Sequence, residues 1–169
     1  MIDVTDFRNG MSMLGGAVSV ITTADCQGLY GMTASAVCSV TDNPPTLLVC
    51  INRNAWSHDR FIESGKLCVN VLAAGQQELS GRFASKHITM TDRFTSRDWS
   101  TLKTGAPVLI NALVNFDCNI SHTHEVGSHT VFFAEIQAVR LGESNDGLVY
   151  FNRHYHELPH RVQQDLPPA

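Results

Sequence analysis

The chain has 169 residues, 43% of them hydrophobic, and a formal net charge of −4 at pH 7. This length suits one domain with a sizeable core, and the charge offers no basic surface for nucleic acid or for a membrane. The first residues, MIDVTDFRNGMSML, lack the cationic start of a signal peptide, and no apolar stretch is long enough to span a membrane. We therefore expect a soluble cytoplasmic protein with a single domain over 1–169, its core at about 5–158 and a C-terminal tail at 159–169.

The first third of the chain predicts one helix and then a series of strands. Residues 5–14 place Phe7, Met11 and Leu14 on one helical face, with Thr5 as the N-cap. After Gly15-Gly16, runs rich in β-branched residues predict strands at 17–23, 29–35, 36–41 and 46–52. The sequence DNPP forces a turn before the last of these strands, because proline fixes φ and removes a donor.

The rest of the chain adds two short helices and the remaining strands. Helices are predicted at 55–65 and 75–86, strands at 66–73, 113–126, 129–141 and 147–152, and an irregular excursion at 87–105. Six to eight strands joined by tight turns favour a mainly β fold, an antiparallel barrel with a few short flanking helices. The end of the chain, LPHRVQQDLPPA, is expected to be disordered or draped over a partner.

No catalytic motif of a common class is present. The chain lacks G-x-G-x-x-G after a strand, G-x-x-x-x-G-K-[ST] and the G-x-S-x-G elbow. Its five cysteines are widely spaced without a C-x-x-C pair, which disfavours a disulfide framework and leaves one reactive thiol as an open alternative. A metal hydrolase is the alternative that the histidines raise, but their spacing fixes no set of three zinc ligands. We expect no metal, and surface positions for His122, His124, His154 and His160.

The stretch GMTASAVCSV, residues 31–40, is small and hydroxylated where a strand could carry large side chains. Small residues let a ligand approach the backbone closely. This stretch therefore predicts a platform for a flat group with a polar edge. The alternative is an ordinary pair of strands whose outward-facing side chains are small and bind no ligand.

Six segments of the chain resemble the short-chain flavin reductases, the reductase components of two-component flavin monooxygenases. In order they are FRNGMSMLGGAVSVITT, GMTASAVCSVTDNPPTLLVCINRN, GKLCVNVLAAGQQELSGRFASK, FDCNIS, VGSHTVFFAEI and GLVYFNRHYHEL. The resemblance covers roughly residues 5–158 and is greatest to the reductases of 4-hydroxyphenylacetate hydroxylation and of pyrimidine utilisation. It implies an FMN-binding split β-barrel that forms a homodimer with the flavin near the interface.

The resemblance also implies an activity. Members transfer hydride from NADH or NADPH to FMN or FAD and supply reduced flavin to a separate monooxygenase. The nicotinamide stacks directly on the flavin, so no catalytic acid or base is expected. Two alternatives stay open: a flavin-dependent reductase of another acceptor such as a corrin, and a flavin-binding module without turnover.

The resemblance assigns site residues by position. For the flavin it implies Thr33, Ala34, Ser35, Ala36, Cys38, Ser39, Asn52, Asn54, Ser57, Phe83, Ala84 and Lys86. For the nicotinamide it implies His129, which would assist the reaction, with Arg153, Tyr155 and His156. Simpler roles remain possible: helix capping for Asn54, a solvated helix end for Lys86 and an interface ring for Tyr155. Ala55 and Trp56 depart from the serine-containing pairs of relatives, so we expect the contacts near Asn54 to differ from those in the family.

Overall fold

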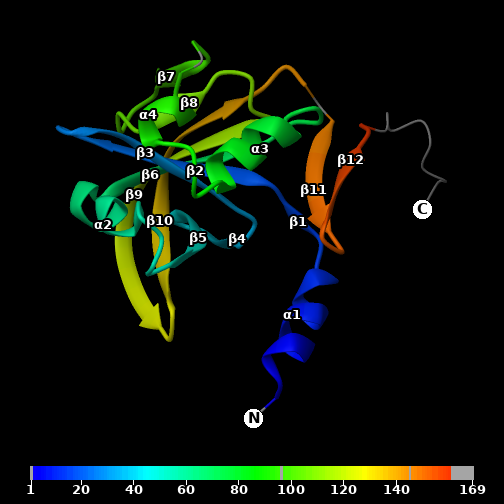
Figure 1. The fold of residues 1–169 in the computed structure, drawn as a ribbon. Helices are drawn as coiled ribbons and strands as arrows, with labels where there is room; N and C mark the ends of the chain where they lie inside the picture. Colours follow the sequence, from blue (N-terminus) through cyan, green and yellow to red (C-terminus); the bar gives the residue numbers. More distant parts are fainter. Residues whose placement is uncertain (1, 96, 145, 161–169) are drawn as a thin grey trace.

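The computed structural model describes residues 2–95, 97–144 and 146–160 (Figure 1). Its helices are α1 (Val4–Ser12), α2 (His58–Ser64), α3 (Gln77–Ala84) and α4 (Met90–Arg93). Its strands are β1 (Gly16–Ala17), β2 (Ser19–Asp25), β3 (Gly28–Ala34), β4 (Val37–Asp42), β5 (Pro45–Asn52), β6 (Lys66–Val71), β7 (Trp99–Thr101), β8 (Pro107–Leu109), β9 (Val114–Val126), β10 (His129–Leu141), β11 (Gly147–Phe151) and β12 (His154–Leu158). Within this described part, no helix is long and apolar enough to cross a membrane.

The strands form one large sheet and two small ones. The large sheet has the order β3-β2-β6-β9-β10-β5-β4, and its paired strands are antiparallel. A three-stranded sheet, β1-β11-β12, and a ribbon, β7-β8, complete the set. The predicted mainly β fold with short helices is confirmed. The strands missed by the prediction, β1, β7, β8 and β12, are short, with two, three, three and five residues.

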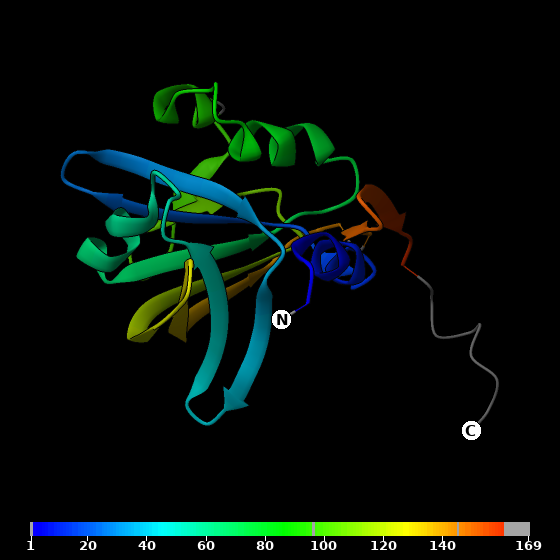
Figure 2. The same cartoon turned by 60° about the horizontal axis from the view of Figure 1, so that its bottom comes forward.

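The two edges of the large sheet converge at one point. β3 and β4 stand at opposite ends of the strand order, yet only Ser35 and Ala36 connect them. Because consecutive Cα atoms are about 3.8 Å apart, the facing ends of β3 and β4 are at most about 11 Å apart. Away from this junction the edges diverge: Figure 2 shows the β2–β3 and β4–β5 hairpins pointing in different directions. This arrangement is a split barrel, in which residues 35 and 36 connect the two edges of the sheet without pairing β3 with β4.

The interior of the large sheet is apolar because alternate residues of its strands point inward. Val49, Ile51 and Phe132 are fully buried there, and Phe61 of α2 packs on Phe132 with ring centroids 6.3 Å apart. α2 ends at Gly65, whose φ of +67° is the left-handed conformation that glycine adopts easily.

α1 lies outside this core. The helix was predicted correctly, but its N-cap is Asp3, whose Oδ1 accepts a hydrogen bond from the Thr5 N–H at 2.7 Å. Phe7 and Met11 are 53% and 48% exposed, so the predicted apolar face is not buried in the chain. The N–H of Asn152 donates to the Ser12 carbonyl at 2.7 Å and joins the helix to the turn between β11 and β12.

Two other predicted regions differ in detail. The segment 87–105, predicted to be irregular, contains α4 and β7, and its Phe94 and Trp99 rings pack on Phe83 with centroids 5.1 and 5.5 Å away. Of the predicted tail, residues 161–169 lie outside the described residues.

Candidate functional site

A cavity of about 480 Å³ opens where β3 and β4 join. Five parts of the fold supply its walls: the β3–β4 junction, the paired ends of β5 and β10, α3, the residue before β2, and the β11–β12 hairpin. The lining residues are Val18, Met32, Thr33, Ala34, Ser35, Ala36, Cys50, Asn52, Ser80, Ala84, His129, Tyr150, Arg153 and Tyr155. Its volume lies within the range of about 300–1,000 Å³ that is typical of small-molecule sites.

The floor of the cavity exposes backbone donors. The carbonyls of Ser35 and Ala36 accept from the N–H groups of Val37 and Cys50, each at 3.0 Å. The N–H groups of Ser35 and Ala36 themselves donate to no acceptor among the residues that the structure describes. Since these side chains are small, they leave room for a ligand with acceptors along one edge to approach the backbone here.

α3 forms one wall because Gly31 allows it to lie close to β3. A Cβ on Gly31 would be 2.7 Å from Cε1 of Phe83 and 3.2 Å from the Ile21 carbonyl oxygen. The Thr33 hydroxyl then donates to the Ser80 carbonyl at 2.6 Å. This contact fixes the α3 face that presents Ser80 and Ala84 to the cavity.

The side chain of Arg93 connects the C-terminal end of α3 to β3. Its side chain is 8% exposed, and Nη1 donates to the carbonyls of Gly31 and Phe83, each at 3.0 Å. Nη2 donates to the Ser85 carbonyl. Burial lowers the pKa of Arg93, but a guanidinium remains charged in proteins. One buried cation therefore ties β3 to α3 through backbone oxygens.

The β11–β12 hairpin supplies an aromatic wall. Tyr150 and Tyr155 are opposite each other in the register, with ring centroids 5.2 Å apart and an interplanar angle of 65°. The Tyr155 hydroxyl lies 2.8 Å from Oγ of Ser80, which links this wall to α3. At the turn, Arg153 has a φ of +63° and donates from Nη2 to Oδ1 of Asn9 at 2.7 Å.

Asn52 and His129 close the remaining side. They are register partners at the ends of β5 and β10, and Nδ1 of His129 lies 2.9 Å from the Ser128 hydroxyl. The Cys50 thiol is half-buried, and this burial raises its pKa. Because the thiolate is the nucleophile, a raised pKa makes Cys50 a poor candidate for covalent chemistry. No group of three or more His, Cys, Asp or Glu side chains suited to a metal occurs among the described residues.

Comparison with known proteins identifies the family. Residues 11–159 match the family model described as "Flavin reductase like domain". The chain belongs to this family. It is 53% identical over 161 residues to "FMN reductase (NADH) RutF" of Acinetobacter baylyi, covering 95% of this chain and 85% of the relative.

Solved structures of flavin reductases share the fold. BorF, the flavin reductase component of a bacterial two-component tryptophan halogenase, has a TM-score of 0.88 and 30% identity, covering 94% of this chain and 100% of BorF. The NADH:FAD oxidoreductase SgcE6 of Streptomyces globisporus C-1027, in complex with NAD and FAD fragments, has a TM-score of 0.84 and 27% identity, with 99% of each chain covered.

The cavity of this flavin reductase-like chain brings together nine of the sixteen predicted site residues. These are Thr33, Ala34, Ser35, Ala36, Asn52, Ala84, His129, Arg153 and Tyr155. They come from five separate segments, so their convergence depends on the sheet order and was implied only by the family resemblance. Their contacts with flavin and nicotinamide remain predictions.

Seven predicted residues do not line the cavity. Cys38 and Ser39 are exposed on β4, which diverges from the junction, and Lys86 is exposed beyond α3. Phe83 is 1% exposed in the core behind Gly31, and Ser57 is 2% exposed at the N-cap of α2. His156 follows Tyr155 on β12, so it points to the opposite face, and its Nε2 lies 3.3 Å from the Phe151 carbonyl.

Asn54, the last of the seven, lies beside a second cavity. This cavity has a volume of about 450 Å³ and is lined by Arg53, Asn54, His58, Asp59, Ile62, Glu125, Gly127 and Ser128. Asn54 does not cap α2, because Ser57 occupies the N-cap position. Instead its N–H donates to Oδ1 of Asn52 at 2.8 Å, which steadies the loop between the two cavities.

Five lining residues were missed by the sequence reasoning: Val18, Met32, Cys50, Ser80 and Tyr150. Met32 directly precedes the predicted residue Thr33, and Cys50 lies two residues before Asn52, on the same face of its strand. Their positions next to predicted residues could have indicated them. Ser80 and Tyr150 carry no local signal. They reach the cavity because α3 lies on β3 and because Tyr150 pairs with Tyr155.

Proposed function

We propose that this protein is an NADH:flavin oxidoreductase, which transfers hydride from NADH to FMN or FAD and releases reduced flavin to a separate oxygenase. The observation that carries this proposal is the pair of unpaired backbone N–H groups, at Ser35 and Ala36, on the floor of a cavity with an aromatic wall. This floor fits the acceptor-rich pyrimidine edge of a flavin ring, which is flat and needs close backbone approach.

Hydride transfer between stacked rings requires the protein to position the two rings, and it does not require a side chain to transfer a proton. Hydride transfer from a nicotinamide to a flavin bound here would require the two rings to be held stacked, at about 3–3.5 Å. Ser35 and Ala36 would hold the ring edge, Tyr150 and Tyr155 would exclude water from one side, and Asn52 would bind polar atoms of the side chain. None of these roles requires a residue to change its protonation state.

The dinucleotide would meet His129 and Arg153. Ser128 engages Nδ1 of His129, which leaves Nε2 for a carboxamide or phosphate oxygen. Arg153 is exposed at the mouth, and a guanidinium suits a phosphate in two-point contact. To reach a phosphate, Arg153 would exchange its hydrogen bond with Asn9 for the ligand.

The relatives support both halves of the proposal. The Acinetobacter relative is named for FMN and NADH, and SgcE6 for NADH and FAD. BorF is one component of a two-component system, which supports a separate oxygenase as the acceptor of reduced flavin here. A cytoplasmic location, where NADH is abundant, stays a prediction.

Steady-state oxidation of NADH tests the activity. We expect absorbance at 340 nm to fall only when FMN or FAD is added, with multiple turnovers per protein molecule. A flavin-binding module would bind the flavin, detected by quenching of its fluorescence, and would show no turnover with excess flavin. A reductase of another acceptor, such as a corrin, would turn over rapidly only when that acceptor is present.

We also propose that the protein forms a homodimer through the outer face of β5 and β10. On this face Leu48 is paired with Phe133, and Cys50 with Val131, and all four residues are half-buried. Cys50 also lines the cavity, so the face continues into the site. Light scattering at micromolar concentration should give a dimer, and Phe133→Lys should give a monomer with weakened flavin binding. Leu29→Lys, at a 43% exposed position on β3, is the control. A fully active monomer would contradict the proposal.

A further inference from the structure

The second cavity adjoins the first at the paired ends of β5 and β10. Asn52 and His129 line the first cavity, whereas their chain neighbours Arg53 and Ser128 line the second. The N–H of Arg53 donates to the Ser128 carbonyl at 2.9 Å, so a hydrogen-bonded pair of backbones separates the two spaces. A ligand long enough to cross this pair of backbones beyond Asn52 would reach the second cavity.

The charged groups of the second cavity are one guanidinium and two carboxylates. Nη1 of Arg53 lies 3.2 Å from Oε2 of Glu125, and their side chains are 46% and 61% exposed. Asp59 adds a second carboxylate. His58 offers no free ring nitrogen, because Nδ1 lies 2.8 Å from Oδ1 of Asp59 and Nε2 lies 2.9 Å from the Thr130 hydroxyl. The one arginine of this lining is thus already paired with a carboxylate.

We propose that Glu125 makes this protein select FMN over FAD. The inference rests on the proposed function, in which the flavin ring occupies the floor at Ser35 and Ala36. In that placement the phosphate of FMN would end the molecule near Asn52, whereas the second phosphate and the adenosine of FAD would extend toward the second cavity. There Glu125 repels the added negative charge and holds the guanidinium of Arg53, which would otherwise bind that phosphate.

The test compares FMN and FAD binding to wild type and to Glu125→Gln, by quenching of flavin fluorescence at low ionic strength. The glutamine keeps the size of the side chain and removes its charge. We expect FAD to bind about fivefold tighter to the variant, while the affinity for FMN changes by less than about twofold. The gain should shrink in about 0.5 M salt, because salt screens exposed charges.

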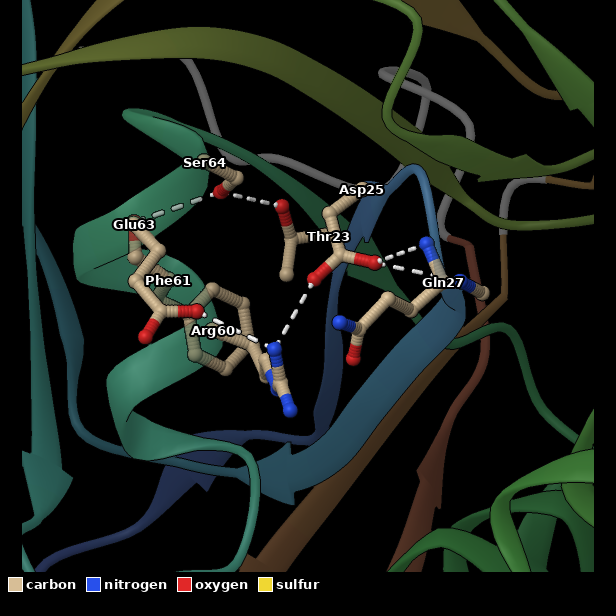
Figure 3. Close-up of polar contacts among 8 residues, drawn as sticks. Thr23, Asp25, Gln27, Arg60, Phe61, Glu63 and Ser64 are labelled. Carbon is tan, nitrogen blue, oxygen red and sulfur yellow. Dashed lines mark hydrogen bonds and ion pairs between the residues drawn. The ribbon is translucent and has the colours of Figure 1, made fainter.

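Glu63→Gln is a closely matched control. Glu63 is 60% exposed, and its Oε2 accepts from Nη1 of Arg60 at 3.1 Å (Figure 3). The variant removes the same charge from a carboxylate that is as exposed as Glu125 and lies outside both cavity linings. We expect no change in the affinity for either flavin.

A second variant tests the part played by Arg53. In Glu125→Gln combined with Arg53→Gln, the gain for FAD should be lost, because no guanidinium is left to bind the second phosphate. An equal gain for FMN and FAD in Glu125→Gln, or no gain for FAD, would overturn the proposal. Failure of the wild type to bind any flavin is a different result, and it would overturn the proposed function itself.

Discussion

Ser35 and Ala36 show how two small residues can matter through their backbone. Their side chains are exposed, and their carbonyls accept hydrogen bonds from the N–H groups of Val37 and Cys50. What remains for a ligand is the pair of N–H groups. Larger side chains would cover these donors without disturbing the strands, so the small size of these residues has its explanation in binding rather than in packing.

Ser35→Phe should therefore abolish flavin binding and leave the fold intact. The ring of the phenylalanine would occupy the space over the floor that the flavin needs. The measurements are the flavin Kd by fluorescence quenching and the thermal midpoint by circular dichroism. Val40→Phe, at a 45% exposed position of β4 outside the cavity lining, is the control. Binding by Ser35→Phe within threefold of wild type would show that the floor is not the platform.

His129→Ala should raise KM for NADH and spare flavin affinity. Loss of one hydrogen bond to a polar or charged group costs about 1–3 kcal/mol, or roughly tenfold to a hundredfold in kcat/KM. kcat at saturating NADH should fall much less, because stacked hydride transfer needs no acid. The control is His124→Ala, an exposed histidine of β9 outside the cavity lining. Unchanged kcat/KM would leave His129 without a role in binding, and a loss of flavin binding alone would move it to the flavin site.

Among the elements, α3 is the one whose position decides the shape of the cavity. Phe83 lies under Gly31, Ser80 receives Thr33, and Arg93 binds the carbonyls of both β3 and α3. The helix is short, and its contacts with β3 hold it in place. A substitution at the contact between α3 and β3 would therefore move two cavity residues, Ser80 and Ala84, although the substituted residue itself would not contact the ligand.

Gly31→Ala and Gly81→Ala should have opposite effects on stability. The added Cβ at Gly31 would be 2.7 Å from a buried aromatic ring, so the free energy of unfolding should fall by about 1–3 kcal/mol, and flavin should bind more weakly as α3 shifts. At Gly81, on α3 itself, the added Cβ would have no neighbour within 4 Å apart from the adjacent residues and the backbone of the helix, so alanine should stabilise the helix by about 0.5–1 kcal/mol. Chemical unfolding of the two variants checks this. A stable Gly31→Ala with normal flavin affinity would mean that α3 does not depend on this close approach.

The elements were easier to predict than their arrangement. The run 129–141 gave the bounds of β10 because its β-branched and aromatic residues are bounded by a glycine-containing turn and by Gly142. The N-cap of α1 was placed at Thr5 instead of Asp3, since both residue types cap helices well. β7 and β12 were missed because short strands depend on pairing partners that are distant in the sequence or lie beyond a turn.

At the scale of the whole molecule, the site exists because the sheet closes at one corner. The order β3-β2-β6-β9-β10-β5-β4 brings the ends of β3, β5 and β10 together, and no periodicity in the sequence specifies that order. The family resemblance supplied the fold and nine of the lining residues. It did not supply the aromatic pair with Tyr150 or the burial of Phe83, which follow from how α3 and β12 pack in this chain.

The packed interior also makes a prediction about stability and pH. Cys68 and Cys118 are both fully buried on neighbouring strands of the large sheet. Burial, with Asp117 nearby, raises the pKa of Cys118 from 9.0 to about 12, and burial likewise raises the pKa of Cys68. In the folded protein these thiols therefore stay protonated at a pH where the unfolded chain would lose their protons.

The sign of the effect follows from proton binding. Above about pH 9 the folded state holds more protons than the unfolded state, so the free energy of unfolding falls as pH rises. For Cys118 the loss should be about 1–1.5 kcal/mol between pH 8 and pH 10, and it should level off above the folded pKa of about 12. The measurement is urea unfolding at several pH values for wild type and Cys118→Ala.

The variant should be less stable at every pH, because it leaves a cavity, but its free energy of unfolding should depend less on pH between pH 8 and pH 10 than that of wild type. Cys26→Ala, which removes an exposed thiol, should keep the wild-type slope. Parallel profiles for wild type and Cys118→Ala would show that the Cys118 thiol ionises equally easily in the folded and unfolded protein, and so that the interior around it is open to water.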